Sequence, residues 1–235
     1  MTADFKQKIQ LVLLAGIVIA GARTGYILYE RHAERVEPAT TAAAPLNPDY
    51  YVTPKKLHPY DVKSARQLTE QPVWVREGYY YTYYHYDPAR KSVEFAHPAG
   101  LLGPLEKLQI KDVVTAPTPG EPGQKQVMAT FERSGESYAF PIGMEQDGNF
   151  RIDSDDILYI QDPHELYKHW PPEIWQAIDS HQVKPGMNEL QVSFAIGYGT
   201  LESSGDSRTL KYPNGGQPIT ITYEDGKAAQ IKPGR

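Results

Sequence analysis

The pattern of apolar and polar positions separates an apolar start from two regions with different periodicity. Residues 72–162 contain short apolar runs separated by Gly, Pro, Asn and Asp, which is typical of strands joined by turns. Residues 163–235 begin with apolar positions at helical spacing and end in three short strand-like runs. The pattern predicts an α+β fold in which a small β-barrel precedes a domain of helices and sheet.

Several short strands are predicted in residues 72–162, too few for a large sandwich and enough for a barrel of SH3-like size. The predicted strands are Val73–Val75, Tyr79–Tyr86, Ser92–Ala96, Gln109–Val114, Gln126–Phe131, Ser137–Phe140 and Ile157–Ile160. Ser134-Gly135 lies between two of these runs and predicts a hairpin turn.

Residues 163–235 change to helical spacing and then return to strands. Helices are expected at Pro163–Trp170, Pro172–His181 and Asn188–Ile196, and Gly197 is expected to end the last one. Strands are expected at Arg208–Tyr212, Pro218–Tyr223 and Lys227–Ile231. The Asp225-Gly226 pair between the last two is a strong hairpin signal.

The strand at residues 79–86 is aromatic on both faces, whereas a half-buried strand alternates apolar with polar side chains. Either both faces are covered within the fold, or one face contacts a partner. Tyrosine and tryptophan are enriched at protein interfaces, so these side chains are candidate partner contacts. The candidates are Tyr79, Tyr80, Tyr81, Tyr83, Tyr84, Tyr86, Trp74 and Trp170.

The N-terminal residues 1–35 contain an apolar run at residues 9–29. It has the basic start, apolar centre and small-residue site (Ala20-Gly21-Ala22) of a signal peptide, and also about the length of a transmembrane helix. We expect an anchor that contacts the lipid bilayer. Small residues would let partner helices approach closely. They are Ala15, Gly16, Ala20, Gly21 and Gly25.

Lysines before the apolar run favour a cytoplasmic N-terminus. The expected location is therefore the inner (cytoplasmic) membrane, with the later domains on the periplasmic side. Residues 36–71 are rich in Pro, Ala and Thr near their start and are expected to form a spacer before the barrel.

Composition narrows the classes of function. The chain has 235 residues, a formal net charge of -5 and scattered basic residues, so it carries no basic footprint for nucleic acid. It contains no cysteine, which excludes disulfides, thiolate metal sites and a cysteine nucleophile.

Motifs for catalysis or metal binding are weak. His164 and His169 are five residues apart, so they do not share a helix face as two zinc ligands would. The carboxylates of Asp153, Asp155 and Asp156 lack the spacing of a calcium loop. No GxSxG elbow, phosphate loop or dinucleotide fingerprint is present. We therefore expect no enzyme activity, no metal and no cofactor.

Several short motifs in roughly the last sixty residues resemble the BamE-like (SmpA/OmlA) family of exported domains. They are Val183-Lys184-Pro185-Gly186-Met187, Val192, Gly197, Tyr212, Ile219–Tyr223 and Asp225-Gly226-Lys227. The resemblance implies two helices against a three-stranded antiparallel sheet, and a non-catalytic module that supports a membrane assembly. The chain departs from the family in lacking a cysteine for lipidation, and in having Tyr198-Gly199 where a proline often stands.

These observations favour a non-enzymatic structural or assembly subunit of a bacterial membrane protein complex, whether respiratory, photosynthetic or envelope-assembling. Its expected partners are other subunits of that complex. An exported module that binds a glycan or a peptide is the first alternative, and would require an aromatic groove. A metal-dependent enzyme is the second, and would require His164, His169 or residues 153–156 to converge in a pocket.

Overall fold

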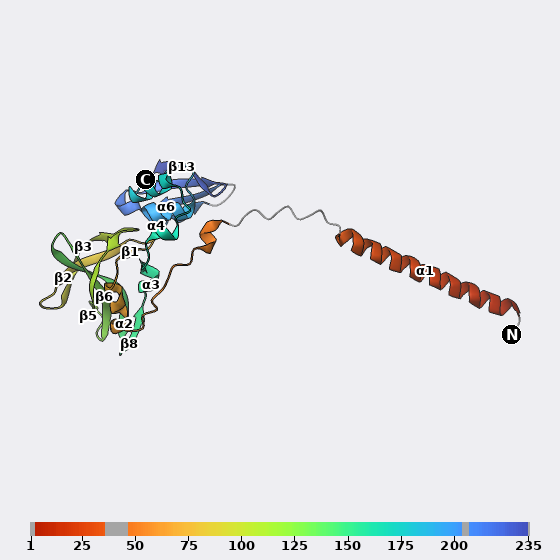
Figure 1. The fold of residues 1–235 in the computed structure, drawn as a ribbon, viewed down its shortest axis with the longest axis horizontal. Coiled ribbons are helices and arrows are strands. Elements are labelled where there is room, and N and C mark those ends of the chain that lie inside the picture. Colours follow the sequence, from red (N-terminus) through yellow and green to blue (C-terminus); the bar gives the residue numbers. More distant parts are fainter. Residues whose placement is uncertain (1–2, 36–46, 204–206, 235) are drawn as a thin grey trace. The chain divides into compact units, whose positions relative to one another are not determined.

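The structure is a computed structural model that describes residues 3–35, 47–203 and 207–234, with side chains in the first helix described at residues 14 and 16–31. The chain divides into two compact units, residues 1–50 and residues 51–235. Figure 1 shows the elements of each unit. Each unit is described by itself below.

The first unit contains helix α1 (Ala3–Arg35). Within the described residues, no helix is both long enough and apolar enough to cross a membrane, so the transmembrane helix expected over residues 9–29 is wrong. The physical reason lies in Arg23, a charged residue inside the expected span. Charged side chains within a bilayer are costly unless they are paired or reach the interface.

The small residues expected to pack against partner helices lie along α1. Beside Gly16, Gly21 and Gly25, no atom of the described part of the chain lies within 4 Å of the position that a Cβ would take. Ala20 is exposed, and the side chain of Ala15 lies outside the described residues.

The second unit begins with two antiparallel sheets. The larger has the order β3-β2-β7-β6-β5, with β8 paired to β7, and the smaller has the order β4-β1-β9. The larger sheet comprises β2 (Tyr81–Asp87), β3 (Ser92–Leu102), β5 (Ile110–Pro117), β6 (Gln124–Arg133), β7 (Glu136–Gln146) and β8 (Asn149–Ile152). The smaller comprises β1 (Val73–Val75), β4 (Lys107–Leu108) and β9 (Leu158–Tyr159).

Local turn chemistry sets the register of the larger sheet. Ser134 and Gly135 have φ values of 53° and 85° and join β6 to β7, as the sequence predicted. Asp147 and Gly148 have φ values of 53° and 80° and join β7 to β8. Two successive positive φ values give the turn that matches the twist of paired strands, so both hairpins are specified locally.

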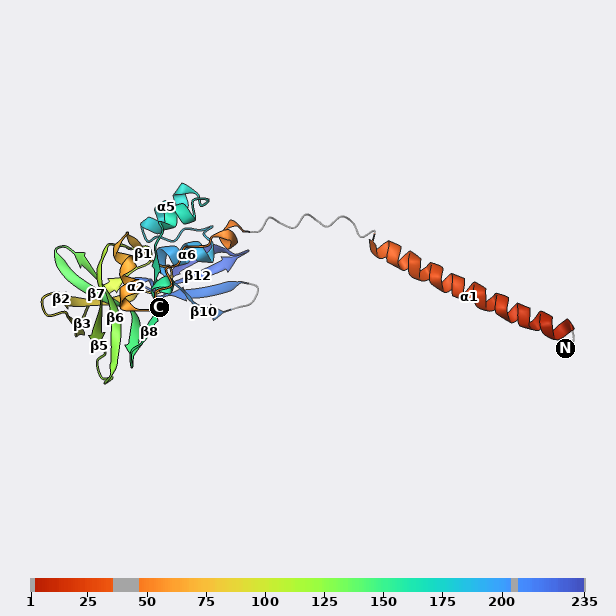
Figure 2. The same ribbon diagram turned by 60° about the horizontal axis from the view of Figure 1, so that its bottom comes forward.

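Residues 163–234 form the helix-and-sheet part of the second unit. Its helices are α4 (Pro163–Leu166), α5 (Pro172–Asp179) and α6 (Glu189–Ile196). Its antiparallel sheet has the order β10-β11-β12-β13, formed by β10 (Thr200–Ser203), β11 (Arg208–Tyr212), β12 (Ile219–Glu224) and β13 (Lys227–Pro233). Helix α6 lies across this sheet (Figures 1 and 2). The sheet has one strand more than expected, because β10 precedes the three predicted strands.

Helix α6 begins and ends where the sequence predicted. Asn188 and Gln191 form a capping box, in which each side chain accepts a hydrogen bond from the other residue's backbone N–H. Gly197, with φ of 86°, ends the helix in a conformation that other residues rarely adopt.

Residues 51–71, which were expected to belong to the spacer, are part of the second unit. They contain α2 (Val62–Ala65) and the 3₁₀ turn η2 (Arg66–Thr69), preceded by the turn η1 (Pro48–Tyr51). Ala65 and Leu68 are buried in the hydrophobic core beside the two sheets, which we call the two-sheet core. The rest of the expected spacer lies mostly outside the described residues.

Strands β1 and β9 form a wall shared by two hydrophobic cores. Val73 and Val75 point into the two-sheet core, whereas Trp74 between them belongs to the core of the helix-and-sheet part. In β9, Leu158 and Tyr159 divide in the same way. Because side chains alternate across a strand, one short sheet can be buried on both faces. Trp74 and Tyr159, which precede the boundary predicted at residue 162, therefore belong to the same core as residues that follow it, and residues 51–235 form one compact unit.

Candidate functional site

The six tyrosines at positions 79–86 separate into three environments. Tyr81 and Tyr83 pack in the two-sheet core, and Tyr83 meets the rings of Phe131 and Tyr138 edge-on. Tyr84 and Tyr86 pack on a small cluster on the opposite face of the sheet. The alternation expected of a strand is thus present within β2, and it covers both faces with protein.

Tyr79 and Tyr80 precede β2 and differ from the others. The side chain of Tyr79 is 66% exposed, whereas Tyr80 is half-buried. The two tryptophans proposed as contacts, Trp74 and Trp170, are both buried in the core of the helix-and-sheet part. Of the predicted contact residues, Tyr79 and Tyr80 are therefore the ones that border open space at the junction of the two cores.

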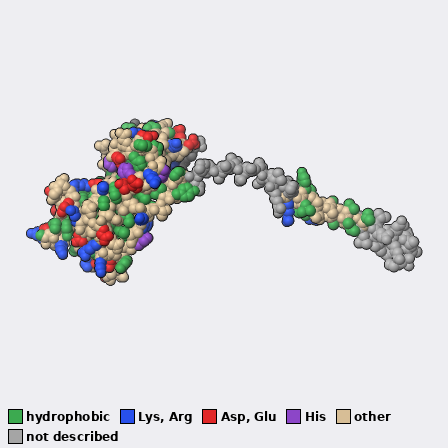
Figure 3. All heavy atoms as spheres, viewed as in Figure 1, with side chains coloured by type: hydrophobic (Ala, Val, Ile, Leu, Met, Phe, Trp, Pro, Cys, Tyr) green, Lys and Arg blue, Asp and Glu red, His purple; other side chains and the backbone are tan. Residues whose placement is uncertain are grey.

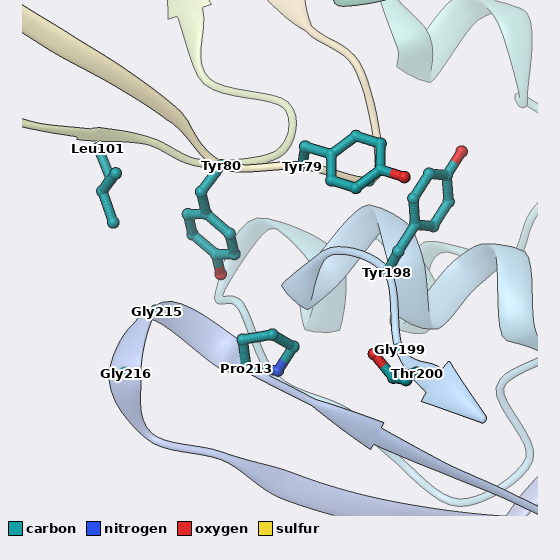
Figure 4. Close-up of a pocket in the computed structure, with 10 residues that line it drawn as sticks. Tyr79, Tyr80, Leu101, Tyr198, Gly199, Thr200, Pro213, Gly215 and Gly216 are labelled. Carbon is teal, nitrogen blue, oxygen red and sulfur yellow. The ribbon is translucent and has the colours of Figure 1, made fainter. Parts of the chain in front are cut away.

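Tyr79 and Tyr80 line a hollow of about 410 Å³ that we call the tyrosine groove. Its ten lining residues are Gly78, Tyr79, Tyr80, Leu101, Tyr198, Gly199, Thr200, Pro213, Gly215 and Gly216. Figure 4 shows Tyr80 reaching from the upper strand toward Pro213 and Gly215, with Tyr79 and Tyr198 beside each other across the opening. The groove is therefore built by four separate segments of the chain, residues 78–80, Leu101, residues 198–200 and residues 213–216.

Tyr198 faces Tyr79, and the two rings meet edge to face with centroids 5.4 Å apart. The backbone N–H of Tyr198 donates to the carbonyl of Gly78 at 2.8 Å. Gly78 has φ of 123°, and a Cβ at this residue would run into the Tyr198 ring. The ring thus packs directly on backbone, an arrangement that only glycine permits.

Tyr198 was not among the predicted contact residues. The sequence signal for Tyr198 was its position directly after Gly197, which ends the helix. The BamE-like family, which this part of the chain resembles, often has a proline there. Gly197 is itself restricted to glycine, since a Cβ at this residue would lie 2.6 Å from the carbonyl oxygen of Gly78.

Tyr80 stands between the tyrosine groove and a second hollow. Its hydroxyl donates to the carbonyl of Ile196 at 3.4 Å, a long hydrogen bond. Burial raises the pKa of the Tyr80 phenol. Burial, followed by the nearby negative charge of Glu77, raises the pKa of Tyr198 as well. Both phenols therefore stay protonated at neutral pH and can donate a hydrogen bond to a ligand.

The tyrosine groove carries no charged side chain among its lining residues, all of which the structure describes. Its polar side chains are the three phenols and Thr200. The arrangement can bind apolar or weakly polar groups through ring faces and a few hydrogen bonds.

The second hollow, which we call the acidic pocket, has a volume of about 490 Å³. It shares Tyr80 and Leu101 with the tyrosine groove and is lined further by Gly103, Pro104, Leu105, Glu106, Ile178, Asp179 and His181. The Nδ1 atom of His181 lies 3.0 Å from the carbonyl oxygen of Ala195. Sequence reasoning missed this pocket because its residues come from three distant segments.

The histidine pair considered for zinc is not brought together as a metal site. His164 lies between two carboxylates, with Nδ1 at 2.9 Å from Asp162 and Nε2 at 3.1 Å from Asp179. Its ring also stacks on Trp175, with centroids 4.1 Å apart. Among the described side chains, no cluster of three or more His, Cys, Asp or Glu residues is arranged to hold a metal ion.

The carboxylates at residues 153–156 fasten neighbouring segments. Asp155 accepts hydrogen bonds from the backbone N–H groups of Leu57 and His58, at 2.9 and 2.8 Å. Asp153 pairs with Arg151, and Asp156 pairs with Lys56. These contacts hold residues 56–58 against residues 155 and 156, which accounts for the acidic cluster without a bound ion.

A second charged network supports the segment that leads into the groove. The Glu77 carboxylate is buried and accepts from the Tyr159 hydroxyl at 2.5 Å, while the Arg76 guanidinium lies over the Tyr159 ring at 4.6 Å. Arg76 also donates to the carbonyl of Asp155 at 3.1 Å. Arg76 and Glu77, the two residues before Gly78, are therefore held in place by their contacts with Asp155 and Tyr159.

Comparisons with protein-family models, with curated proteins and with solved structures gave no match to this chain. The resemblance to the BamE-like family and the SH3-like size of the barrel therefore stay predictions. The functional argument rests on the groove itself.

Proposed function

We propose that this protein is a non-enzymatic interaction subunit that binds a short extended segment of a partner protein in the tyrosine groove. The observation that carries the proposal is a pair of exposed tyrosine rings over an uncharged hollow. Ligand sites in proteins are usually concave, largely apolar and supplied with a few placed polar groups, as this groove is.

The exposure of the groove residues supports a contact surface. Tyr79, Leu101 and Tyr198 are 66%, 53% and 46% exposed, and all three line the same hollow. Scattered apolar side chains on a surface are ordinary, but a cluster beside a hollow marks a site of interaction. Tyrosine is suited to it, because it offers a large contact area and loses little conformational freedom.

A peptide fits the lining better than a glycan does. A sugar presents a hydroxyl on most carbons, and each one buried without a partner is unfavourable. The lining provides three phenols and Thr200 as polar side chains, which is few for such a ligand. An extended peptide needs fewer partners, because its backbone groups can use those phenols while its side chains meet the rings.

The proposal concerns the second unit alone and does not rest on a membrane span. An assembly role in a larger complex and an extracytoplasmic location remain predictions. On the face shown in Figure 3, acidic and basic side chains are interspersed over the second unit. The aromatic groove, rather than a field of one charge sign, is therefore the basis of the proposed recognition.

Site-specific photo-crosslinking tests the proposal. A photo-activatable phenylalanine at position 79, in the full chain expressed in its native host, should form an adduct with a partner protein. The same residue at position 60 is the control, because Tyr60 is 76% exposed and does not line the groove. Tyr198→Ala should abolish the adduct at position 79. Equal adducts at positions 60 and 79, or an adduct unaffected by Tyr198→Ala, would refute the proposal.

A further inference from the structure

The acidic pocket adjoins the tyrosine groove so closely that one extended ligand can occupy both. Tyr80 and Leu101 line both hollows, so only the thickness of these side chains separates them. Successive residues of an extended chain advance about 3.3 Å and point to alternate sides. Two side chains two positions apart point to the same side and can therefore enter the two hollows.

The two hollows differ in charge. The tyrosine groove has no charged lining residue, whereas two acidic residues, Glu106 and Asp179, are among those that line the acidic pocket. Glu106 forms an ion pair with Arg133, which offsets its charge. Asp179 shares His164 with Asp162, so even a protonated His164 leaves this trio with a net charge of about -1.

The negative charge that remains on the Asp179 side of the pocket complements a cation. A lysine or arginine side chain reaches about 6 Å from its Cα, which is enough to place its head group beside a carboxylate while its methylenes lie on an apolar wall. Leu105 and Ile178 supply such a wall in the acidic pocket.

We infer that the partner segment carries a lysine or arginine within about two positions of the residue held by the tyrosines, and that this basic side chain binds in the acidic pocket beside Asp179. The inference rests on the proposed function, because it assigns the second contact of the same bound peptide. It commits to a basic peptide rather than to a second copy of the chain.

Selection from a displayed library of short randomised peptides tests both ideas and tells them apart. The full-length protein is the bait, and Tyr79→Ala and Asp179→Asn variants are used in parallel. We expect to select peptides that bind the wild-type protein but not the Tyr79→Ala variant. These peptides should carry a basic residue close to an aromatic or other apolar one. With Asp179→Asn the preference for a basic residue should fall.

The selected peptide then gives the affinity test. Replacing its basic residue with glutamine, or replacing Asp179 with asparagine, should each weaken binding roughly two- to fivefold, as for an exposed ion pair. The two changes together should weaken binding no more than either alone, since they remove the same contact. Asp162→Asn is the matched control, because Asp162 also contacts His164 but does not line the pocket, and asparagine retains the helix cap.

The possible outcomes distinguish failure of the proposed function from failure of the inference. If no peptide binds in a way that depends on Tyr79, the proposed function fails. If binding depends on Tyr79 but shows no preference for a basic residue, or if Asp179→Asn has no greater effect than Asp162→Asn, the inference is overturned and the proposed function stands. A concentration-dependent dimer that Tyr79→Ala dissolves would assign the groove to a second copy and would also overturn the inference.

Discussion

Replacing Gly78 with alanine tests whether the groove depends on the backbone contact beneath Tyr198. Gly78 has φ of 123°, which lies in the region that L side chains rarely adopt. A Cβ there would overlap the Tyr198 ring, whose backbone N–H is fixed to the Gly78 carbonyl at 2.8 Å. The ring therefore cannot yield without loss of the groove wall.

Two separate effects set the expected size of the loss. Holding alanine at this positive φ costs about 1–3 kcal/mol of folding free energy. Overlap with the Tyr198 ring adds about 1–3 kcal/mol, as for an overpacked site. Gly78→Ala should therefore lower the free energy of unfolding by about 2–6 kcal/mol.

Gly120→Ala is the matched control for backbone strain without overlap. Gly120 also has a positive φ, 78°, but no described atom lies within 4 Å of its Cβ position. Urea unfolding followed by tryptophan fluorescence reports on the core, since Trp74, Trp170 and Trp175 are all buried. The difference between the two variants isolates the overlap with Tyr198.

A double-mutant cycle tests the assigned cause. If the Tyr198 ring is what the new methyl group meets, Tyr198→Ala should remove part of the destabilisation by Gly78→Ala. The double variant should then be at least about 1 kcal/mol more stable than the sum of the single effects predicts. If Gly78→Ala destabilises no more than Gly120→Ala, or if the two effects simply add, the packing argument is refuted.

Three further predictions concern the scaffold. Burial raises the pKa of Tyr212 to about 12 and also raises the pKa values of Tyr159 and Tyr223. The contribution of these three tyrosines to the free energy of unfolding is therefore complete below about pH 10. It is lost as pH rises, by about 1.4 kcal/mol per pH unit for each tyrosine. Urea titrations at stepped pH should show this decline, and a flat profile would contradict it. Asp155→Ala should lower stability by about 1–3 kcal/mol, because two backbone N–H groups lose their acceptor, and hydrogen exchange at residues 57 and 58 should accelerate; unchanged exchange would contradict the anchoring role. Asn188→Ala should cost about 1 kcal/mol through loss of the cap of α6, whereas Asn188→Ser should retain most of it; equal losses would argue against capping.

The sequence predicted those elements whose signals are local. The hairpins at Ser134-Gly135 and Asp225-Gly226 were found because their turn residues are specified within two positions, and both show paired positive φ values. Strand β10 was missed because all four of its residues are exposed, so it has no apolar alternation to detect. Its pairing with β11 is set by the sheet rather than by its own sequence.

The membrane helix is the opposite case from β10, because the sequence predicted a span that the structure does not bear out. Over residues 9–29 the length and apolarity of the run predicted a span, although Arg23 lies within it. No described helix is long and apolar enough to cross a membrane. Length and local apolarity are not sufficient when a charged side chain lies within the segment.

The site was half predictable from the sequence. Tyr79 and Tyr80 stood out through the aromatic run, but Tyr198 and Asp179 have no local signal that relates them to it. Those residues join the site through the packing of separate segments. Single-sequence patterns report periodicity within an element, and they do not encode contacts between elements far apart in the chain.

The shared wall explains why these contacts can form a fixed site. Trp74 and Tyr159 enter one core while Val73, Val75 and Leu158 enter the other, so the two cores cannot separate without exposing both faces of the wall. The segment after β1 leads directly into the groove, and its Gly78 carbonyl accepts a hydrogen bond from the backbone N–H of Tyr198, two residues after α6. The groove is therefore largely formed before a ligand arrives, and a preorganised site loses less free energy to ordering when it binds. It follows that substitutions at the junction should alter affinity even where they touch no ligand.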